Sequence, residues 1–193
     1  MRMLNKIKTI YIANSTIFRK FWVNQIAISL LGVMVTWPMI VLSDNMPELH
    51  EMPILFAGIF CGGLFCFLIY DLFYQLGAKD FIKVSHKKID PDPYKALKIT
   101  AIAYSPTLLL MFLSVVFFFL APSAEIVTSG ILNIGIHAMY SGIYFFIPKP
   151  FNLIAFPLCA AVTFFFAHLG YYLASHDKYL RSLFGFTVKI NKE

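Results

Sequence analysis

Five long apolar runs, separated by short charged segments, dominate this chain of 193 residues. They cover residues 21–43, 52–70, 99–124, 126–148 and 150–176. Each run is about the length that an α-helix needs to cross roughly 30 Å of hydrocarbon. Charged residues make up only 13% of the chain, about half the usual share in a soluble domain. The sequence therefore predicts an all-α, polytopic transmembrane helical bundle, a single membrane domain over 1–193.

The distribution of Lys and Arg indicates how many of the runs cross the membrane. Basic residues cluster before the first run, between the second and third, and after the last, whereas only Lys149 separates the fourth from the fifth. If the fourth run does not cross, fifteen of the sixteen basic residues lie on one side, and if it crosses, twelve do. The positive-inside rule favours the first arrangement. We therefore expect a cytoplasmic N- and C-terminus and four spans, at about 21–43, 52–76, 97–122 and 151–175.

The fourth run has the composition of a helix that does not simply face lipid. Polar residues recur in it at every fourth position, namely Ser129, Asn133, His137 and Ser141. In a regular helix these residues form a single polar stripe. We therefore predict a non-spanning helix at about 126–147, interfacial or re-entrant on the outer side of the membrane. The alternative is a fifth span whose polar stripe packs against the other helices.

The first twenty residues mix Lys and Arg with apolar side chains such as Ile7, Ile10 and Phe18. This pattern is typical of an amphipathic helix on an anionic membrane surface, with a frayed leader as the alternative. A cleavable signal peptide is not expected, because no small-residue cleavage site follows the long basic stretch and its apolar run. The basic segments lie between apolar runs, so their expected partners are acidic lipid headgroups and not nucleic acid, despite a net charge of +6.

Small residues form a packing motif in the second span. Gly58 and Gly62 make a GxxxG pattern, with Cys61 beside it. Small residues four apart allow two helix backbones to approach closely in lipid. The motif predicts close helix packing, within the chain in preference to a dimer.

Asp71 is an acidic residue within an otherwise membrane-like helix, and such residues usually face the bundle interior or water. In the four-span arrangement His168 lies at a similar depth, with Tyr171 one turn further along. An Asp71–His168 pair would act as a proton relay or a ligand contact. The alternative is that Asp71 reaches interfacial water beside Gln75.

The loop between the second and third spans holds His86, Asp90 and Asp92, weak candidates for a divalent-cation site. Each of the two aspartates precedes a proline, which favours turns and a solvated loop. We therefore expect no metal and no other cofactor. The chain contains no P-loop, HExxH or GxSxG motif, so no catalytic residue is assigned.

Three stretches resemble a known group of proteins: YDLFYQLGAKDFIKV at 70–84, AYSP at 103–106 and AHLGYYLASHDK at 167–178. Their layout resembles that of small multi-pass membrane proteins of unassigned function from Gram-positive bacteria. The resemblance implies a bacterial plasma membrane and a cytoplasmic tail, and it transfers no catalytic residue.

These features favour a non-enzymatic subunit or accessory of a membrane assembly, with a protein partner or a second copy of the chain. One alternative is a small transporter or channel component with a polar site near Asp71 and His168, to which Asn133 and His137 would add. The other is a membrane-embedded enzyme that uses the His and Asp residues of the loop.

Overall fold

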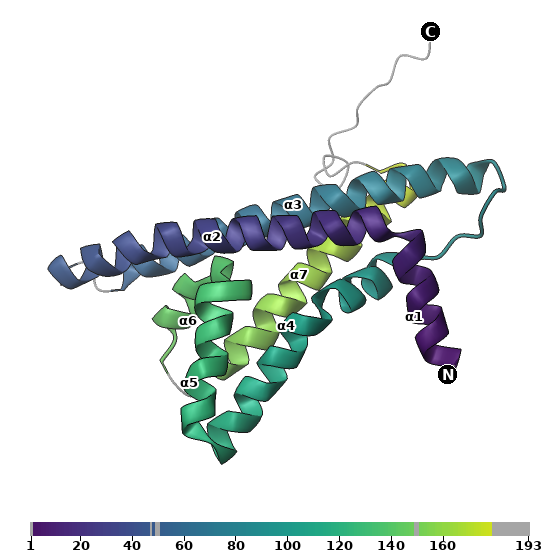
Figure 1. Ribbon diagram of the computed structural model, residues 1–193. Coiled ribbons are helices and arrows are strands. Elements are labelled where there is room, and N and C mark those ends of the chain that lie inside the picture. The colour runs from purple at the N-terminus through teal and green to yellow at the C-terminus, as the bar shows by residue number, and fades with distance from the viewer. Residues whose placement is uncertain (1, 47, 49–50, 149–150, 179–193) are drawn as a thin grey trace, which may run out of the picture.

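The computed structural model describes residues 2–46, 48, 51–148 and 151–178, and these form helices joined by short connections (Figure 1). In chain order the elements are α1 (Arg2–Ala13), α2 (Ser15–Asn45), α3 (Met52–Ser85), α4 (Lys95–Leu120), α5 (Pro122–Gly130), the π-helix η2 (Ile131–Ile136), the 3-10 helix η3 (Ala138–Tyr140), α6 (Ser141–Phe146) and α7 (Asn152–Ser175). The basic tail beyond Lys178 and the lone Lys149 of the charge argument lie outside the described residues.

Four of these helices, α2, α3, α4 and α7, are long and apolar enough to cross a membrane. They correspond to the four predicted spans, although α4 ends two residues before the predicted boundary at 122 and α7 begins one residue after the predicted start at 151. Helix α3 continues nine residues past the predicted boundary at 76. It continues because positions 78–85 contain no glycine or proline to stop it, and because Asp80 extends its buried face. The helix ends just before Lys87, whose φ of 56° breaks the helical backbone.

Contacts between the spans establish their directions. The carboxylate of Asp80, near the end of α3, contacts Lys95 at the start of α4 and Tyr171 near the end of α7. The end of α3, the start of α4 and the end of α7 therefore lie together, at what we call the basic end of the molecule. Since α4 leaves the basic end and α7 returns to it, the segment between them begins and ends at the opposite end.

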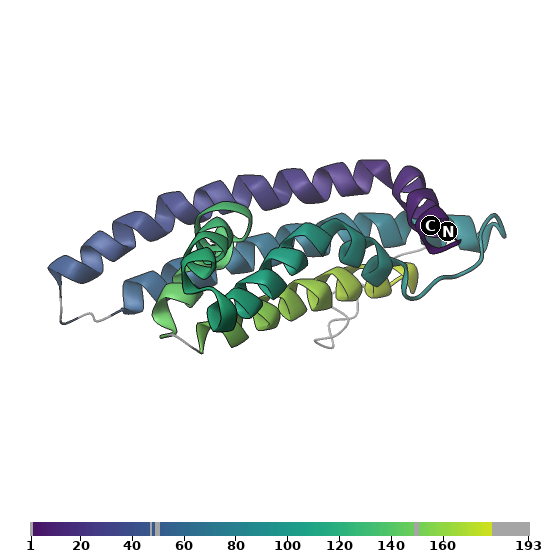
Figure 2. The same cartoon turned by 60° about the horizontal axis from the view of Figure 1, so that its bottom comes forward.

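This segment is a re-entrant element. It enters the bundle through α5 and η2, bends by 90° and leaves through η3 and α6. Figure 2 shows this pair inserted among the four long helices. The predicted architecture of four long apolar helices, with a further helical segment between the third and fourth, is thus confirmed. The directions of α4 and α7 favour a re-entrant segment over a fifth crossing.

Glycines allow the re-entrant segment to approach α3. A Cβ atom added to Gly58 would lie 2.5 Å from the backbone nitrogen of Ile143, and one added to Gly142 would meet the backbone carbonyl of Ile54. The ring of Tyr140 lies 2.5 Å from the corresponding position on Gly62. The GxxxG face of α3 is therefore occupied by the re-entrant segment of the same chain.

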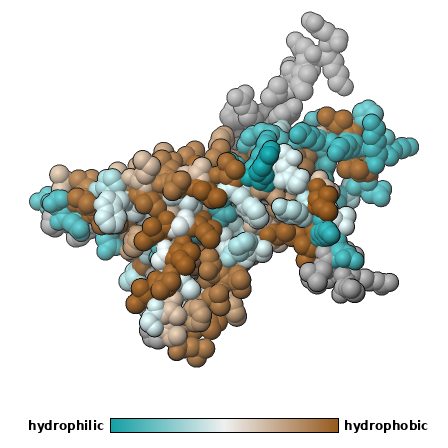
Figure 3. Space-filling view, in the orientation of Figure 1, coloured by the Kyte–Doolittle hydropathy of each residue, from teal (hydrophilic) through white to brown (hydrophobic). Residues whose placement is uncertain are grey.

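The surface of the bundle is apolar over most of its length. On α2 the side chains of Leu30, Met34 and Trp37 are 62%, 73% and 68% exposed. Figure 3 shows this apolar surface in brown over the body of the molecule, with polar residues concentrated at the basic end. An apolar surface of this extent requires lipid or another protein as its neighbour.

The N-terminal segment forms helix α1, which ends at Ala13 and turns sharply away from α2 at Asn14 (Figure 1). Its apolar side chains Ile7, Tyr11 and Ile12 remain exposed. A short helix of this kind beside basic residues has the form of an interfacial helix that lies along a membrane surface.

We predict that Gly58→Ala destabilises the protein by about 1–3 kcal/mol, because the new methyl group overpacks against the re-entrant backbone. The matched control is Gly63→Ala, since a Cβ at Gly63 meets nothing within 4 Å. That change should leave stability unchanged or raise it by up to about 1 kcal/mol through helix propensity. The midpoint of thermal unfolding in detergent measures the stability of both variants. Equal midpoints would contradict the close contact between Gly58 and the re-entrant backbone.

Candidate functional site: a re-entrant segment bent at His137

The re-entrant segment changes helix type just before its bend. The α-helix of α5 gives way to the π-helix over residues 131–136, and His137, with φ −120° and ψ 20°, ends it. Gly130 and Gly135 lower the helix propensity of this stretch. The predicted single stripe of Ser129, Asn133, His137 and Ser141 is therefore wrong, because it assumed one regular helix through all four residues.

The bend frees the backbone carbonyl of Ile136, and α2 supplies its hydrogen-bond donors. Ser29 Oγ donates to this oxygen at 2.9 Å, and Gln25 Nε2 donates at 3.1 Å. Gln25 Nε2 also donates to Thr107 Oγ1 of α4 at 2.8 Å. Lipid offers no donors of its own, so an irregular backbone is stable in the membrane only where protein groups satisfy it.

His137 is fully buried and both of its ring nitrogens are hydrogen-bonded. Nε2 pairs with the hydroxyl of Tyr104 on α4, and Nδ1 pairs with the hydroxyl of Tyr144 on α6. A neutral imidazole has one donor and one acceptor nitrogen. One tyrosine therefore donates to the ring and the other accepts from it, and no acid is needed to balance a charge.

A second chain of hydrogen bonds extends the cluster to α3 and α7. The ring of Tyr140 packs beside His137 with centroids 4.8 Å apart. Its hydroxyl lies 3.0 Å from Thr163 Oγ1 and 3.1 Å from Cys66 Sγ. All four spans thus contribute a polar side chain to the region around the bend. We call His137, Tyr104, Tyr140 and Tyr144 the histidine cluster.

The histidine cluster lies between the four long apolar helices. Phe21 packs against Phe65 and Tyr104, with ring centroids 6.2 and 5.9 Å away, so these three residues lie at one level of the bundle, next to the two basic residues that precede Phe21. Ser29, which bonds Ile136, lies eight residues or about 12 Å further along α2. That distance is close to the half-thickness of a hydrocarbon layer, about 15 Å. The re-entrant tip therefore extends deep into the bundle from the end opposite the basic end.

Asp71 and His168, predicted to pair, form no hydrogen bond with each other. Asp71 is exposed, and its Oδ2 accepts a hydrogen bond from Gln75 Nε2 at 2.8 Å. It lies six residues or about 9 Å beyond Phe65 toward the basic end, at headgroup depth. His168 stands beside the ring of Tyr172, and its Nδ1 is buried without a hydrogen-bond partner in the described part of the chain. The position of Asp71 beside Gln75 agrees with the alternative given in the sequence analysis, in which Asp71 does not pair with His168.

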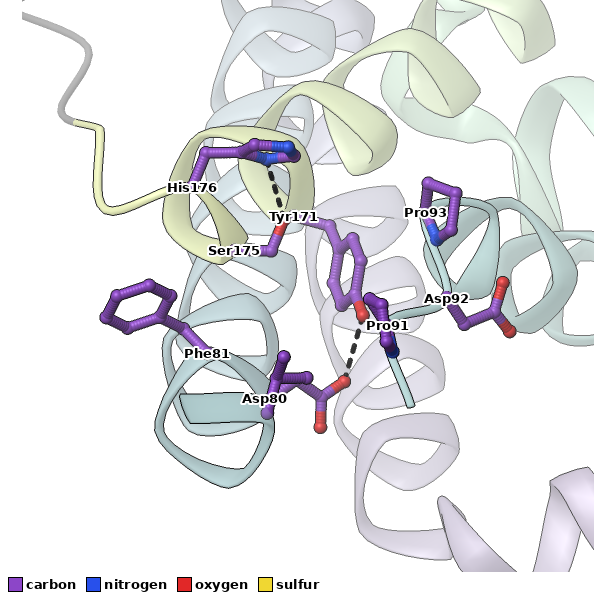
Figure 4. A pocket seen from close by; sticks show the side chains of 9 residues that line it. Asp80, Phe81, Pro91, Asp92, Pro93, Tyr171, Ser175 and His176 are labelled. Atoms are coloured by element: carbon purple, nitrogen blue, oxygen red, sulfur yellow. Dashed lines mark hydrogen bonds between the residues drawn. The ribbon is translucent and has the colours of Figure 1, made fainter. Parts of the chain in front are cut away.

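Tyr171, assigned to the same predicted site, contacts a different acid. Its hydroxyl donates to Asp80 Oδ2 at 3.0 Å, and Lys95 Nζ lies 2.6 Å from the same oxygen. Asp80 is 3% exposed although it lies beyond the predicted end of the second span at 76. Figure 4 shows the Tyr171 hydroxyl pointing at this carboxylate. Both residues line a cavity of about 310 Å³, together with Pro91 and His176.

The loop residues considered for metal binding do not come together. His86 is exposed and its Nδ1 lies 2.7 Å from the carbonyl oxygen of Ile82, at the end of α3. Asp92 forms an ion pair with Lys98 at 2.8 Å, and Asp90 is exposed. Over the described residues, no three His, Cys, Asp or Glu side chains lie close enough to hold a metal ion.

Asn133 is left half-buried on the lipid-facing side of the re-entrant segment. Its amide oxygen Oδ1 is buried and has no hydrogen-bond donor within the described part of the chain. Nearby, Thr36 and Ser141 satisfy each other, with their hydroxyl oxygens 3.0 Å apart. The side chains of the histidine cluster therefore satisfy one another's hydrogen bonds, whereas the amide oxygen of Asn133 accepts no hydrogen bond from the described part of the chain.

No protein-family model, no curated protein and no solved structure matches this chain. The geometry alone therefore carries the functional argument. It gives a closed polar cluster between the long apolar helices, a cavity beside the Asp80–Lys95 ion pair at the basic end, and an amide without a hydrogen-bond donor, within the described residues, in an apolar groove.

We predict that Tyr144→Phe lowers the free energy of unfolding by about 1–3 kcal/mol, because His137 Nδ1 then stays buried without a partner. Tyr94→Phe is the matched control, since Tyr94 is 62% exposed and its loss of a hydroxyl should change nothing. Denaturant unfolding in mixed micelles measures both. Equal stability of the two variants would show that the hydroxyl of Tyr144 does not hold the re-entrant bend.

Proposed function

We propose that this chain is a bacterial plasma-membrane protein that acts as a non-enzymatic subunit or accessory of a membrane assembly. The observation that carries the proposal is the half-buried amide of Asn133, which lines an apolar groove at the surface of the bundle and whose Oδ1 has no hydrogen-bond donor within the described part of the chain. A polar side chain in such a groove is costly without a hydrogen-bond partner. A neighbouring transmembrane helix that supplies a hydroxyl or amide donor removes this cost and adds helix–helix contact.

The surface around Asn133 has the shape to receive such a helix. A groove of about 180 Å³ runs between α2 and the re-entrant segment. Its lining is apolar apart from the amide and two hydroxyls, and consists of Val33, Thr36, Trp37, Ile40, Asn133, Ile134, Ser141 and Phe145. Trp37 stands at its edge with most of its ring exposed. Aromatic side chains of this kind are enriched where proteins meet.

The distribution of charged residues between the two ends supports a cytoplasmic location for the basic end. Arg19 and Lys20 at the start of α2 lie at the same end as the Lys-rich loop that joins α3 to α4. The opposite end carries the acidic residues Asp44 and Glu51. This asymmetry follows the positive-inside rule. In this orientation we expect the basic residues and α1 to lie against the anionic inner leaflet and to bind acidic lipid headgroups.

A small transporter or channel component is the second candidate, and the re-entrant segment favours it. Broken helices whose tips reach the middle of the membrane are typical of transporter binding sites. In the described conformation His137 is fully buried and bonded on both nitrogens. A transport role therefore requires a second conformation in which the histidine cluster opens, and the subunit role requires none.

The subunit proposal is tested by photo-crosslinking in cells, with a benzophenone amino acid in place of Trp37. We expect an adduct with another polypeptide. The same probe at Leu109, which is exposed on α4, should give none. Asn133→Leu should remove the Trp37 adduct, because it removes the acceptor. An adduct of twice the chain mass would identify a second copy as the partner, and crosslinks to lipid alone would contradict the proposal.

Orientation is tested with single cysteines and a membrane-impermeant maleimide. The native Cys61, Cys66 and Cys159 are buried, so they should remain unlabelled in intact cells. Asn45→Cys at the end of α2 should be labelled in intact cells. Ser85→Cys at the end of α3 should be labelled only after the membrane is permeabilised, and its labelling in intact cells would reverse the proposed orientation.

A further inference from the structure

A cleft opens where α1 turns away from α2. Its volume is about 520 Å³, and it is lined by Tyr11, Ser15, Thr16, Arg19, Trp22, Val23 and Ile26. Its lining combines the Arg19 guanidinium and two hydroxyls, near the start of α2, with the apolar side chains of Val23 and Ile26 further along the helix. The ion pairs within the described part of the chain do not include Arg19, and the first turn of α2 carries no acidic residue.

A second groove continues the cleft along α2. It measures about 260 Å³ and is lined by Trp22, Gln25, Ile26, Ala103, Pro106, Thr107 and Ile136. Trp22 and Ile26 line both spaces, so the two adjoin along α2, from the basic end toward the re-entrant tip. The indole of Trp22 donates a hydrogen bond to the carbonyl of Ala103 at 2.9 Å, which fixes this shared wall against α4.

Together, the cleft and the groove have the length of one membrane leaflet. They begin beside Arg19, at headgroup depth, and end at Ile136, which Ser29 contacts. Ten residues of helix separate Arg19 from Ser29, or about 15 Å. That is half of the roughly 30 Å hydrocarbon core. A cationic, hydroxyl-bearing cleft followed by an apolar groove of this length matches one phospholipid, with its phosphate outside and an acyl chain inside.

We propose that this cleft is a binding site for a single anionic phospholipid. The phosphate sits between the Arg19 guanidinium and the hydroxyls of Ser15 and Thr16, and one acyl chain follows Val23 and Ile26 toward the re-entrant tip. The site deepens the lipid contact of the proposed function and rests on its cytoplasmic basic end, but it shares no lining residue with the Asn133 groove and needs no protein partner. Net negative charge on the headgroup selects the lipid, since Arg19 brings a full positive charge with no acid to neutralise it.

Trp22 provides the reporter for a direct test. The chain contains two tryptophans, so Trp37→Phe leaves Trp22 alone. In phosphatidylcholine bilayers we expect a minor fraction of brominated phosphatidylglycerol to quench Trp22 more strongly than the same fraction of brominated phosphatidylcholine. The preference should be about fivefold, the factor that one basic residue contributes near anionic lipid. Trp22→Phe, which leaves Trp37 at the other end, should show no preference.

Arg19→Gln and Lys20→Gln form a matched pair, because each removes one exposed positive charge and only Arg19 lines the cleft. Arg19→Gln should abolish the preference at Trp22, and Lys20→Gln should reduce it less than twofold. Equal losses in the two variants, or equal quenching by the two brominated lipids in the parent, would overturn the proposal. Native mass spectrometry of the full chain should likewise retain one phosphatidylglycerol in Lys20→Gln and lose it in Arg19→Gln.

Competition with soluble glycerol phosphate tests whether the site binds the whole lipid or the phosphate alone. We expect it to leave the quenching of Trp22 by brominated phosphatidylglycerol unchanged, since the acyl chain in the groove holds the lipid in place. Displacement by glycerol phosphate at concentrations equal to the lipid would show that the site binds phosphate alone, and would overturn the assignment of a phospholipid.

Discussion

Lipid cannot hydrogen-bond a protein backbone, and this constraint explains most of the interior of the bundle. A straight span satisfies its own carbonyls, but the bend at His137 leaves the carbonyl of Ile136 without a helical partner. Gln25 and Ser29 of α2 donate to it, and two tyrosines fix the ring of His137 from opposite sides. One break in one helix therefore accounts for polar side chains on every span around it.

The overall fold was largely predictable, because span length and the bias of Lys and Arg are local properties of the sequence. They identified the four crossings and the non-spanning segment. They did not identify the bend itself, since the fourfold spacing of polar residues was interpreted as a single regular helix. The π-helical turn and the break at His137 shift the register, so Ser141 lies on α6 and faces Thr36 instead of continuing a stripe from Asn133.

The site was less predictable because its pairs join distant residues. His137 was among the candidates, but Tyr104 lies 33 residues away on another helix, and nothing in the sequence links the two. The acid inside the bundle was misassigned because α3 is longer than predicted. The predicted span ended at 76, so Asp71 was taken as the acid that faces the other helices. The helix continues, and Asp80 contacts α7 instead; its spacing of four from Leu76, on the buried face, was the available signal.

The length of α3 has a mechanical consequence. Its 34 residues extend about 51 Å, roughly 20 Å more than the hydrocarbon is thick. The surplus projects from the basic end as a rigid post, and the Asp80 carboxylate ties α4 and α7 to it through Lys95 and Tyr171. A displacement of the end of α3 is therefore passed directly to the start of α4 and the end of α7 through these two contacts.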